Sequence, residues 1–335
     1  MMCLQKASTV ARVSASAAST PGRVALARRR VGDRVGDGVL HLVTAAAALS
    51  VSVILILLVY ELIKRSRLSM STFGFGFLTS NAWDPVKSQF GALDFLLGTA
   101  YTAGLTLLVA GPVAIAIALF LTELAPGGVR GVIATLVELL AAIPSVVIGL
   151  WGIFVLGPVV QSDIGPFLHR TLGFLPFFKG TPQLTGYLPA VIVLTIMVLP
   201  ITASVSRELF LTVPRDLKEA ALALGATRWE MIRGVVLPYT RGGLVAAVTL
   251  GLGRAIGEAI AVTQVIGGQR VFHLSLFRNG DTLASRIAAQ YQGASTFIQT
   301  SALVELALVL LVFSLIVNIT GQIIVRRFER QHEAR

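Results

Sequence analysis

The feature that most constrains this 335-residue chain is a series of apolar stretches, each long enough to cross a lipid bilayer. Six such stretches lie near residues 39–63, 94–121, 131–156, 187–206, 242–266 and 302–325. Apolar residues make up 55% of the chain and charged residues 13%, whereas an ordinary soluble domain has about 25% charged residues. Because backbone in lipid has to satisfy its own hydrogen bonds, the pattern predicts an all-α polytopic membrane protein with about six transmembrane helices.

The Lys and Arg residues are distributed unevenly over the segments that join these stretches. If the N-terminus is cytoplasmic, 18 of the 28 lie on the cytoplasmic side and 9 on the other, with Arg254 inside the fifth stretch. This difference predicts that both termini are cytoplasmic, although Lys64, Arg65 and Arg67 act against it. The net charge of +11 lies in tails and loops, so it does not indicate nucleic acid binding.

The chain ends are predicted to be tails. Residues 1–38 are rich in Ala, Ser and Arg and lack the apolar core of a secretory signal, which predicts a flexible basic cytoplasmic tail. An organelle transit peptide shares this composition and remains an alternative. Residues 39–325 are then the transmembrane domain, and residues 326–335 are a C-terminal cytoplasmic tail.

A polar segment, residues 207–241, separates the fourth and fifth apolar stretches. Pro214 suits the first turn of a short helix, and Gly225 suits its left-handed C-terminal cap. Thr227 and Glu230 have the spacing of a capping box that opens a second short helix. The segment is therefore predicted to form a helix-turn-helix on the membrane surface.

The same segment contains a specific motif, which we call the EAA motif: Glu219, Ala220, Ala221, Gly225, Val235, Leu237 and Pro238. Its spacing resembles the EAA signature of the permease subunits of ABC importers, with Val235 where the signature prefers Ile. The resemblance implies the type I permease fold of ABC importers. It also implies that residues 207–241 are a coupling loop that sits in a groove of a separate ATPase. An ordinary amphipathic connector is the alternative.

Other stretches resemble the PstC-type permease of phosphate-specific importers. They are Phe77-Leu78-Thr79-Ser80, Trp83-Asp84-Pro85-Val86, Glu138 to Ser145, Ser206 to Leu209, Gly253 to Glu258, Thr282 to Ala284 and Ala288 to Gln290. The resemblance implies an ATP-driven phosphate importer in a prokaryotic cytoplasmic membrane. Its implied partners are a PstA-type second permease, a PstB-type ATPase dimer and a PstS-type extracytoplasmic phosphate-binding protein. Ala259 stands where this family usually has Thr, which weakens the case for a polar site there.

Three charged residues inside the apolar stretches are the candidates for a substrate pathway. A charge in lipid costs about 3 kcal/mol or more, so Arg254, Glu258 and Glu138 each need a partner or a function. Arg254 and Glu258 are expected one turn apart on one helix face. Either they pair with each other, or Arg254 compensates a passing anion while Glu258 fixes the guanidinium or accepts a proton. Glu138 either lines the pathway or pairs with Arg130 or a neighbouring helix.

Two further acidic residues, Asp94 and Glu305, are interpreted as interfacial charges at the N-terminal ends of apolar helices.

Catalytic motifs are not apparent in the sequence. The four histidines are scattered, and no Gly-x4-Gly-Lys-Ser/Thr phosphate loop occurs. The chain is therefore predicted to be a non-catalytic transport subunit that binds no cofactor, with ATP and Mg²⁺ used by the partner ATPase. The alternatives are a permease for another oxyanion such as molybdate or sulfate, the PstA-type partner itself and a stand-alone secondary transporter. A secondary transporter should show internal repeats, and none is evident.

Overall fold

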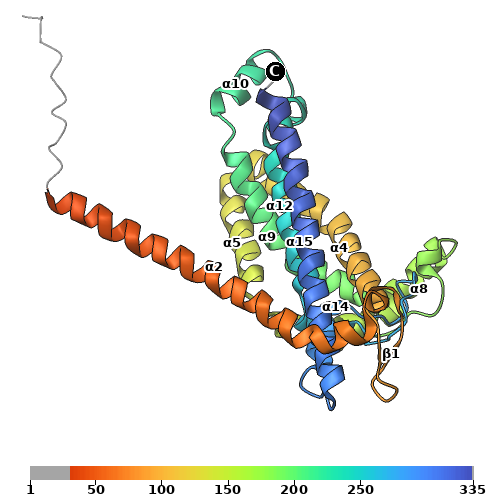
Figure 1. Ribbon diagram of the computed structural model, residues 1–335. Coiled ribbons are helices and arrows are strands. Elements are labelled where there is room, and N and C mark those ends of the chain that lie inside the picture. Colours follow the sequence, from red (N-terminus) through yellow and green to blue (C-terminus); the bar gives the residue numbers. More distant parts are fainter. Residues whose placement is uncertain (1–30, 334–335) are drawn as a thin grey trace, which may run out of the picture. The chain divides into compact units, whose positions relative to one another are not determined.

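The structure is a computed structural model that describes residues 31–333 (Figure 1). The chain divides into two units, residues 1–58 and residues 59–335. The described part of the first unit belongs to helix α2 (Val31–Phe73), whose apolar side chains are exposed there. Helix α2 begins within the segment 1–38 that was predicted to be a flexible tail, and the rest of that prediction lies outside the described residues. The predicted C-terminal tail is helical as far as Glu333.

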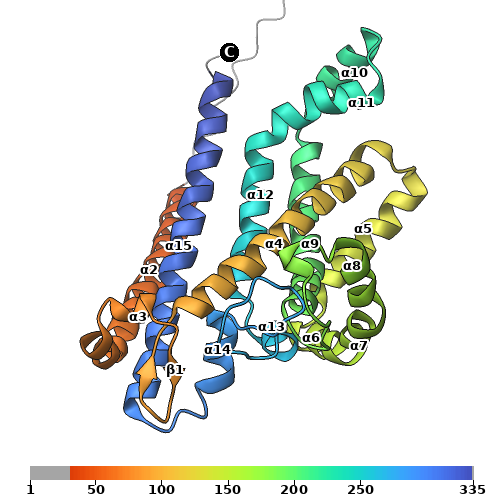
Figure 2. The ribbon, with the colours of Figure 1, turned by 90° about the vertical axis from the view of Figure 1, so that its right-hand side faces the viewer.

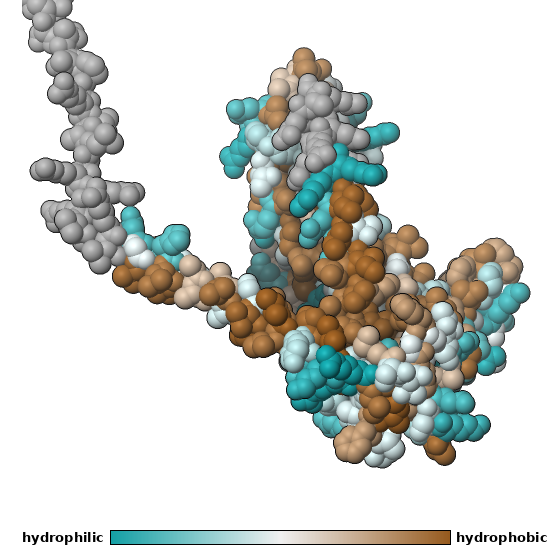
Figure 3. Space-filling view, in the orientation of Figure 1, coloured by the Kyte–Doolittle hydropathy of each residue, from teal (hydrophilic) through white to brown (hydrophobic). Residues whose placement is uncertain are grey.

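Six of the described helices are long and apolar enough to cross a membrane, which confirms the predicted number. They run over Gly36–Phe73, Leu93–Leu124, Ser145–Leu172, Tyr187–Leu211, Arg228–Gly257 and Phe297–Arg327. Figure 3 shows apolar side chains along the visible surface of the first and the last of these helices. Such a surface suits lipid or other membrane helices rather than water.

Four long helices form the centre of the second unit: α4 (Leu93–Leu119), α9 (Tyr187–Leu211), α12 (Leu237–Gly257) and α15 (Phe297–Glu333). Helix α4 packs against α9, and α12 packs against α15, α9 and α4 (Figure 2). Small residues allow close packing between these helices. Gly251 of α12, for example, faces Thr202 of α9 so closely that a β-carbon would overlap its hydroxyl.

The third predicted stretch, 131–156, is interrupted in the structure. Helix α5 (Gly127–Ala142) ends where Ile143 and Pro144 adopt extended backbone, and α6 (Ser145–Trp151) begins after them. Proline has no amide hydrogen and disfavours helical backbone at the residue before it, which explains the break. The helical run then continues through a π-helical turn at Gly152–Leu156, α7 (Gly157–Val159), a second π-helical turn at Val160–Ile164 and α8 (Gly165–Leu172).

The fifth predicted stretch, 242–266, is also interrupted. Helix α12 ends at Gly257, Glu258 is extended, and a short helix α13 (Ile260–Val265) follows. Hydropathy depends on residue type and not on backbone direction. The prediction from hydropathy therefore treated the two helices as one stretch.

An aromatic cluster closes the end of the bundle opposite α10 (Arg215–Ala223). The two-residue strands β1 (Trp83–Asp84) and β2 (Gln89–Phe90) pair antiparallel, with Trp83 opposite Phe90. The Trp83 ring meets the rings of Phe90 and Phe95 edge to face, at centroid distances of 5.0 and 5.2 Å. Trp83 Nε1 also donates to Gln290 Oε1 of α14 (Leu283–Gln290) at 2.8 Å. Segments that are far apart in the chain therefore meet at this end.

A short 3-10 turn, Pro176–Phe178, and α3 (Gly76–Thr79) complete the described elements there.

A buried ion pair lies beside this cluster. Arg286 Nη2 is 2.5 Å from Asp281 Oδ2, and the side chains are only 5% and 4% exposed. Ser285 donates its hydroxyl to Asp281, and Arg286 donates to the Gly268 carbonyl at 3.1 Å. Burial raises the pKa of the Asp281 carboxyl, whereas the guanidinium beside it acts in the opposite direction. The two charges are tolerated in the protein interior because each compensates the other.

The ion pair generates a prediction about stability. Asp281→Ala leaves the buried Arg286 charge without its partner and should lower the free energy of unfolding by about 3–5 kcal/mol. We expect a lower midpoint when thermal unfolding of the purified protein is followed by tryptophan fluorescence.

The control is the double variant Asp281→Leu/Arg286→Met, which removes both charges and should regain much of the loss. Equal destabilisation by the single and double variants would contradict the pairing as its cause.

Candidate functional site

The EAA motif lies on a helix-turn-helix at the end of the bundle where α15 also ends (Figures 1 and 2). Helix α10 carries Glu219, Ala220 and Ala221, and α11 (Arg228–Met231) follows the turn. Gly225 has a φ of +88°, which confirms its predicted left-handed conformation. Thr227 N donates to Glu230 Oε2 at 2.8 Å, and Glu230 N donates to Thr227 Oγ1 at 3.3 Å. The predicted capping box is therefore confirmed.

The second helix of this segment is not the isolated short helix that the sequence predicted. It continues through a π-helical turn, Ile232–Val236, directly into α12. Leu237 and Pro238 of the motif form the first turn of α12, where proline is tolerated. One continuous helical run, Arg228–Gly257, therefore joins the EAA motif to the interior of the membrane region.

The motif residues differ in burial. Glu219, Ala220 and Gly225 are exposed, whereas Ala221 and Leu237 are half-buried. Ala221 and Leu237 pack on an apolar cluster that joins α4, α9 and α12, whose buried members are Ala118, Phe210, Val213, Met231, Ile232, Val236 and Leu244. One side of the segment is thus anchored to the bundle, and the other is open.

An ion pair also anchors α10. Lys218 Nζ lies 2.5 Å from Glu123 Oε1, in the π-helical turn Phe120–Leu124 that follows α4. Lys218 additionally donates to the Phe210 carbonyl at 3.4 Å. The sequence did not single out this pair, because its members are 95 residues apart and no local signal joins them.

The open side of the segment carries large apolar side chains. Leu217, Leu222, Leu224 and Trp229 are all exposed, and Leu224 reaches 89%. Large apolar side chains that are exposed on a polar surface segment are typical of a protein-protein contact. This surface therefore suits a partner at the membrane surface.

Arg254 lies on the unpacked side of α12. The buried residues of this helix recur every three or four positions, at Thr240, Leu244, Ala247, Gly251 and Ala255. The opposite stripe, which we call the open stripe of α12, consists of Ala246, Leu250, Arg254 and Gly257, and all four are exposed. Among the described side chains, those of residues 36–327, none forms an ion pair with Arg254. Its charge is thus available to a molecule outside this chain.

Glu258 does not lie on the helix face of Arg254. Because α12 ends at Gly257, Glu258 has extended backbone, with φ −72° and ψ 115°. Its Oε1 accepts a hydrogen bond from Ala261 N at 3.4 Å, at the start of α13. The expectation that Arg254 and Glu258 lie one turn apart on one helix face is therefore wrong, and the alternative in which they form an ion pair is not observed among the described side chains.

Glu138 pairs with a neighbouring helix, which was one of the alternatives. Its Oε1 lies 4.0 Å from Arg207 Nη1 of α9, and Arg207 also reaches Glu208 at 3.7 Å. The other suggested partner, Arg130, instead donates to the Thr122 carbonyl at 2.8 Å. Glu138 remains 65% exposed, and none of the residues of α5 is buried. Within the described part of the chain, Glu138 does not contact Arg254 or Glu258.

A polar groove of about 420 Å³ lies between α12 and α15, next to the open stripe of α12. Asn318, Gln322 and Arg326 of α15 line one wall, and Ala246, Thr249 and Leu250 of α12 line the other. Asn318 also borders Gly253, where a β-carbon would lie 3.6 Å from Oδ1. Asn318, Gln322 and Arg326 were not predicted from the sequence, although a polar side chain at every fourth position of an apolar helix is a recognisable signal.

The sequence and structure were compared with known proteins. The family model "Binding-protein-dependent transport system inner membrane component" matches residues 110–330. The PstC phosphate transport system permease protein of Haemophilus influenzae is 44% identical over 291 residues, 86% of this chain and 92% of that protein. PstC of Mesorhizobium japonicum is 42% identical over 88% and 91% of the two chains. PstC 2 of Mycobacterium tuberculosis is 40% identical over 87% and 92%.

Among solved structures, a chain of a bacterial alginate ABC transporter bound to its periplasmic protein superposes with a TM-score of 0.58. The two sequences are 18% identical, and the superposition covers 89% of this chain and 98% of the other. A second structure of a bacterial alginate-importing ABC transporter gives a TM-score of 0.56 at 20% identity. At this identity the likeness concerns the fold alone.

Proposed function

Because the chain belongs to the family of inner membrane components of binding-protein-dependent transport systems, we propose that it is the permease subunit of an ATP-driven phosphate importer. The observation that carries this proposal is the high identity with PstC permeases over nearly their whole length. The predicted importer-permease fold is confirmed by the solved structures and the six long apolar helices. The chain is a multi-pass protein of the inner, or cytoplasmic, membrane.

We place the EAA motif and both termini on the cytoplasmic side. The excess of Lys and Arg in those segments supports this orientation. It also puts the open side of α10 and α11 where an ATPase can bind. The end that carries the aromatic cluster then faces the extracytoplasmic binding protein.

The partners that we propose are a PstA-type second permease, a PstB-type ATPase dimer and a PstS-type phosphate-binding protein. The unpacked surfaces of α5 and of the open stripe of α12 support a second permease, because each is left open by this chain. The exposed apolar residues of α10 and α11 support the ATPase contact. In this assembly the chain is non-catalytic and binds no nucleotide, while ATP and Mg²⁺ belong to the ATPase.

Arg254 is the residue that meets the anion. Its guanidinium lies exposed on the open stripe and compensates the charge of phosphate as it passes. A single cation binds the anion weakly enough to release it, whereas a cluster of cations would retain it. Glu258 stabilises the break between α12 and α13 by accepting the hydrogen bond from Ala261 N. Because of this break, α12 ends one turn after Arg254.

Glu138 and the polar groove extend the proposed pathway. Glu138 lies on the open surface of α5, and its 4.0 Å pair with Arg207 is loose enough to open. On the other side, the amides of Asn318 and Gln322 and the guanidinium of Arg326 follow the groove towards the cytoplasmic end. These groups offer hydrogen bonds to an anion that leaves Arg254.

The main prediction concerns the cargo. When the chain is co-expressed with its three partner subunits in cells that lack their own phosphate permeases, we expect ATP-dependent uptake of radiolabelled phosphate. Excess unlabelled phosphate should abolish the signal, and excess sulfate or molybdate should not. Competition by sulfate or molybdate would reassign the cargo to another oxyanion, and uptake by the chain alone would indicate a secondary transporter.

A second prediction concerns Arg254. Arg254→Gln removes the charge and keeps most of the side-chain volume, so phosphate uptake should fall by at least about tenfold. Arg254→Lys keeps the charge and should retain part of the uptake. The amount of assembled complex in the membrane is measured for each variant. Wild-type uptake by Arg254→Gln in a normally assembled complex would make Arg254 a structural residue.

A third prediction concerns coupling. Glu219→Trp places a bulky group on the exposed side of α10, and Gly225→Val forces a β-branched residue into the left-handed turn. Each should lose the ATPase in a pulldown or uncouple ATP hydrolysis from transport.

Gly225→Asn is the matched control, because asparagine tolerates this conformation and the space around Gly225 is empty. It should keep both activities. Full coupling in Glu219→Trp and Gly225→Val would remove the coupling role.

A further inference from the structure

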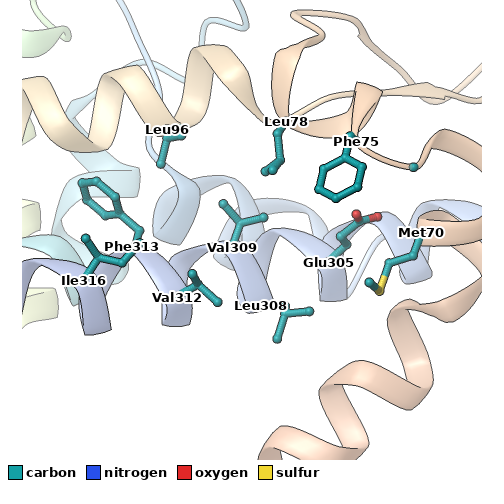
Figure 4. A pocket seen from close by; sticks show the side chains of 11 residues that line it. Met70, Phe75, Leu78, Leu96, Glu305, Leu308, Val309, Val312, Phe313 and Ile316 are labelled. Carbon is teal, nitrogen blue, oxygen red and sulfur yellow. The ribbon is translucent and has the colours of Figure 1, made fainter.

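An apolar groove runs along α15 on the surface of the second unit, and we call it the Glu305 groove (Figure 4). Its volume is about 460 Å³. One wall is formed by Met70, Phe75 and Leu78, from the end of α2 and the segment after it. The other wall includes Leu308, Val312 and Ile316 of α15. The one charged residue in its lining is Glu305.

Glu305 is 7% exposed, and its Oε2 has no hydrogen-bond partner among the described residues. Figure 4 shows the carboxylate directed into the groove, between the side chains of Met70 and Phe75. The prediction that Glu305 stands at the N-terminal end of the last helix is therefore wrong. Helix α15 begins earlier, at Phe297, and places Glu305 two turns inside it.

No cation among the described side chains of residues 36–327 forms an ion pair with this carboxylate. The hydroxyl of Ser69 faces it but brings no positive charge. Arg65, one turn before Ser69 on α2, is already paired with Glu61, with 2.7 Å between Nε and Oε1. A carboxylate at this depth in an apolar groove requires either a proton or a cation from another molecule.

The shape and the charge of the groove together indicate its occupant. Between Glu305 and Ile316, α15 rises about 16 Å, at about 1.5 Å per residue. This length is close to one leaflet of a hydrocarbon core about 30 Å thick. An apolar channel of that length suits one acyl chain, and an acidic group near one end suits a cationic headgroup.

We propose that the Glu305 groove binds a phospholipid with a primary ammonium headgroup, of the phosphatidylethanolamine class. One acyl chain lies along Leu308, Val312 and Ile316, and the ammonium pairs with Glu305. The site is separate from the EAA motif and from the open stripe of α12. The lipid site lies on the outside of the helical bundle.

The test uses the complete transporter, purified and equilibrated with equal amounts of three lipids that have identical acyl chains. Lipid retention is measured by native mass spectrometry. Phosphatidylethanolamine should be retained about tenfold more than anionic phosphatidylglycerol, the difference expected for one charge-assisted hydrogen bond. Phosphatidylcholine should fall between them, because its quaternary ammonium carries the charge without an N–H donor.

Variants separate this site from general lipid binding. Glu305→Gln should reduce retention of phosphatidylethanolamine to the level of phosphatidylglycerol. Val312→Trp should also reduce it, by filling the groove while Glu305 stays in place. Glu61→Gln is the matched control, because that carboxylate already has Arg65 as its partner, and it should change nothing.

Equal retention of the three lipids by the wild-type transporter would overturn the proposal. So would unchanged selectivity in Glu305→Gln, or cross-linking that places a helix of the partner permease in the groove. If Glu305→Gln does not assemble, the lipid series on the wild-type transporter decides the question by itself.

Discussion

The arrangement of this protein depends on the cost of a charge that is removed from water. Where the chain can supply the opposite charge, it does so, as in the buried pair of Asp281 and Arg286. Arg254 on the open stripe of α12 and Glu305 in the apolar groove have no such partner among the described side chains of residues 36–327. These two residues are therefore where the chain is expected to meet other molecules. The cation suits an anionic substrate, and the carboxylate suits a cationic lipid.

The break after Gly257 explains how one arginine can remain unpaired inside a membrane helix. Arg254 occupies the last turn of α12, where the backbone carbonyls have no helical partner and carry partial negative charge. The partial negative charge of these carbonyls stabilises the guanidinium, which therefore needs no carboxylate as a partner. If α12 had continued as a regular helix, Glu258 would have stood one turn away and would have neutralised Arg254. The extended backbone at Glu258 thus keeps the charge available.

Local features were predictable from the sequence, whereas contacts between distant segments were not. The turn at Gly225 and the capping box of Thr227 and Glu230 depend on neighbouring residues only, and both were predicted. The six spans follow from composition. The pair of Lys218 and Glu123 joins residues 95 apart, and the burial of Glu305 depends on the packing of α2 and α3 against α15. A helix end inside an apolar stretch, as at Gly257, leaves no trace in hydropathy.

A single helical run links the proposed ATPase contact to the proposed substrate pathway. Residues Arg228–Gly257 extend without a break from the EAA turn to the turn that carries Arg254, a length of about 45 Å for 30 residues. The ion pair between Lys218 and Glu123 and the apolar cluster around Val236 fasten the outer end of this run to α4 and α9. In the proposed coupling, a displacement of the EAA segment would be transmitted along one continuous helical run rather than through a chain of side-chain contacts. The path includes a π-helical turn at Ile232–Val236, which departs from regular α-helical geometry. Bending at that turn would absorb the displacement, so in the proposed coupling its packing in the apolar cluster would let closure of an ATPase reach Arg254.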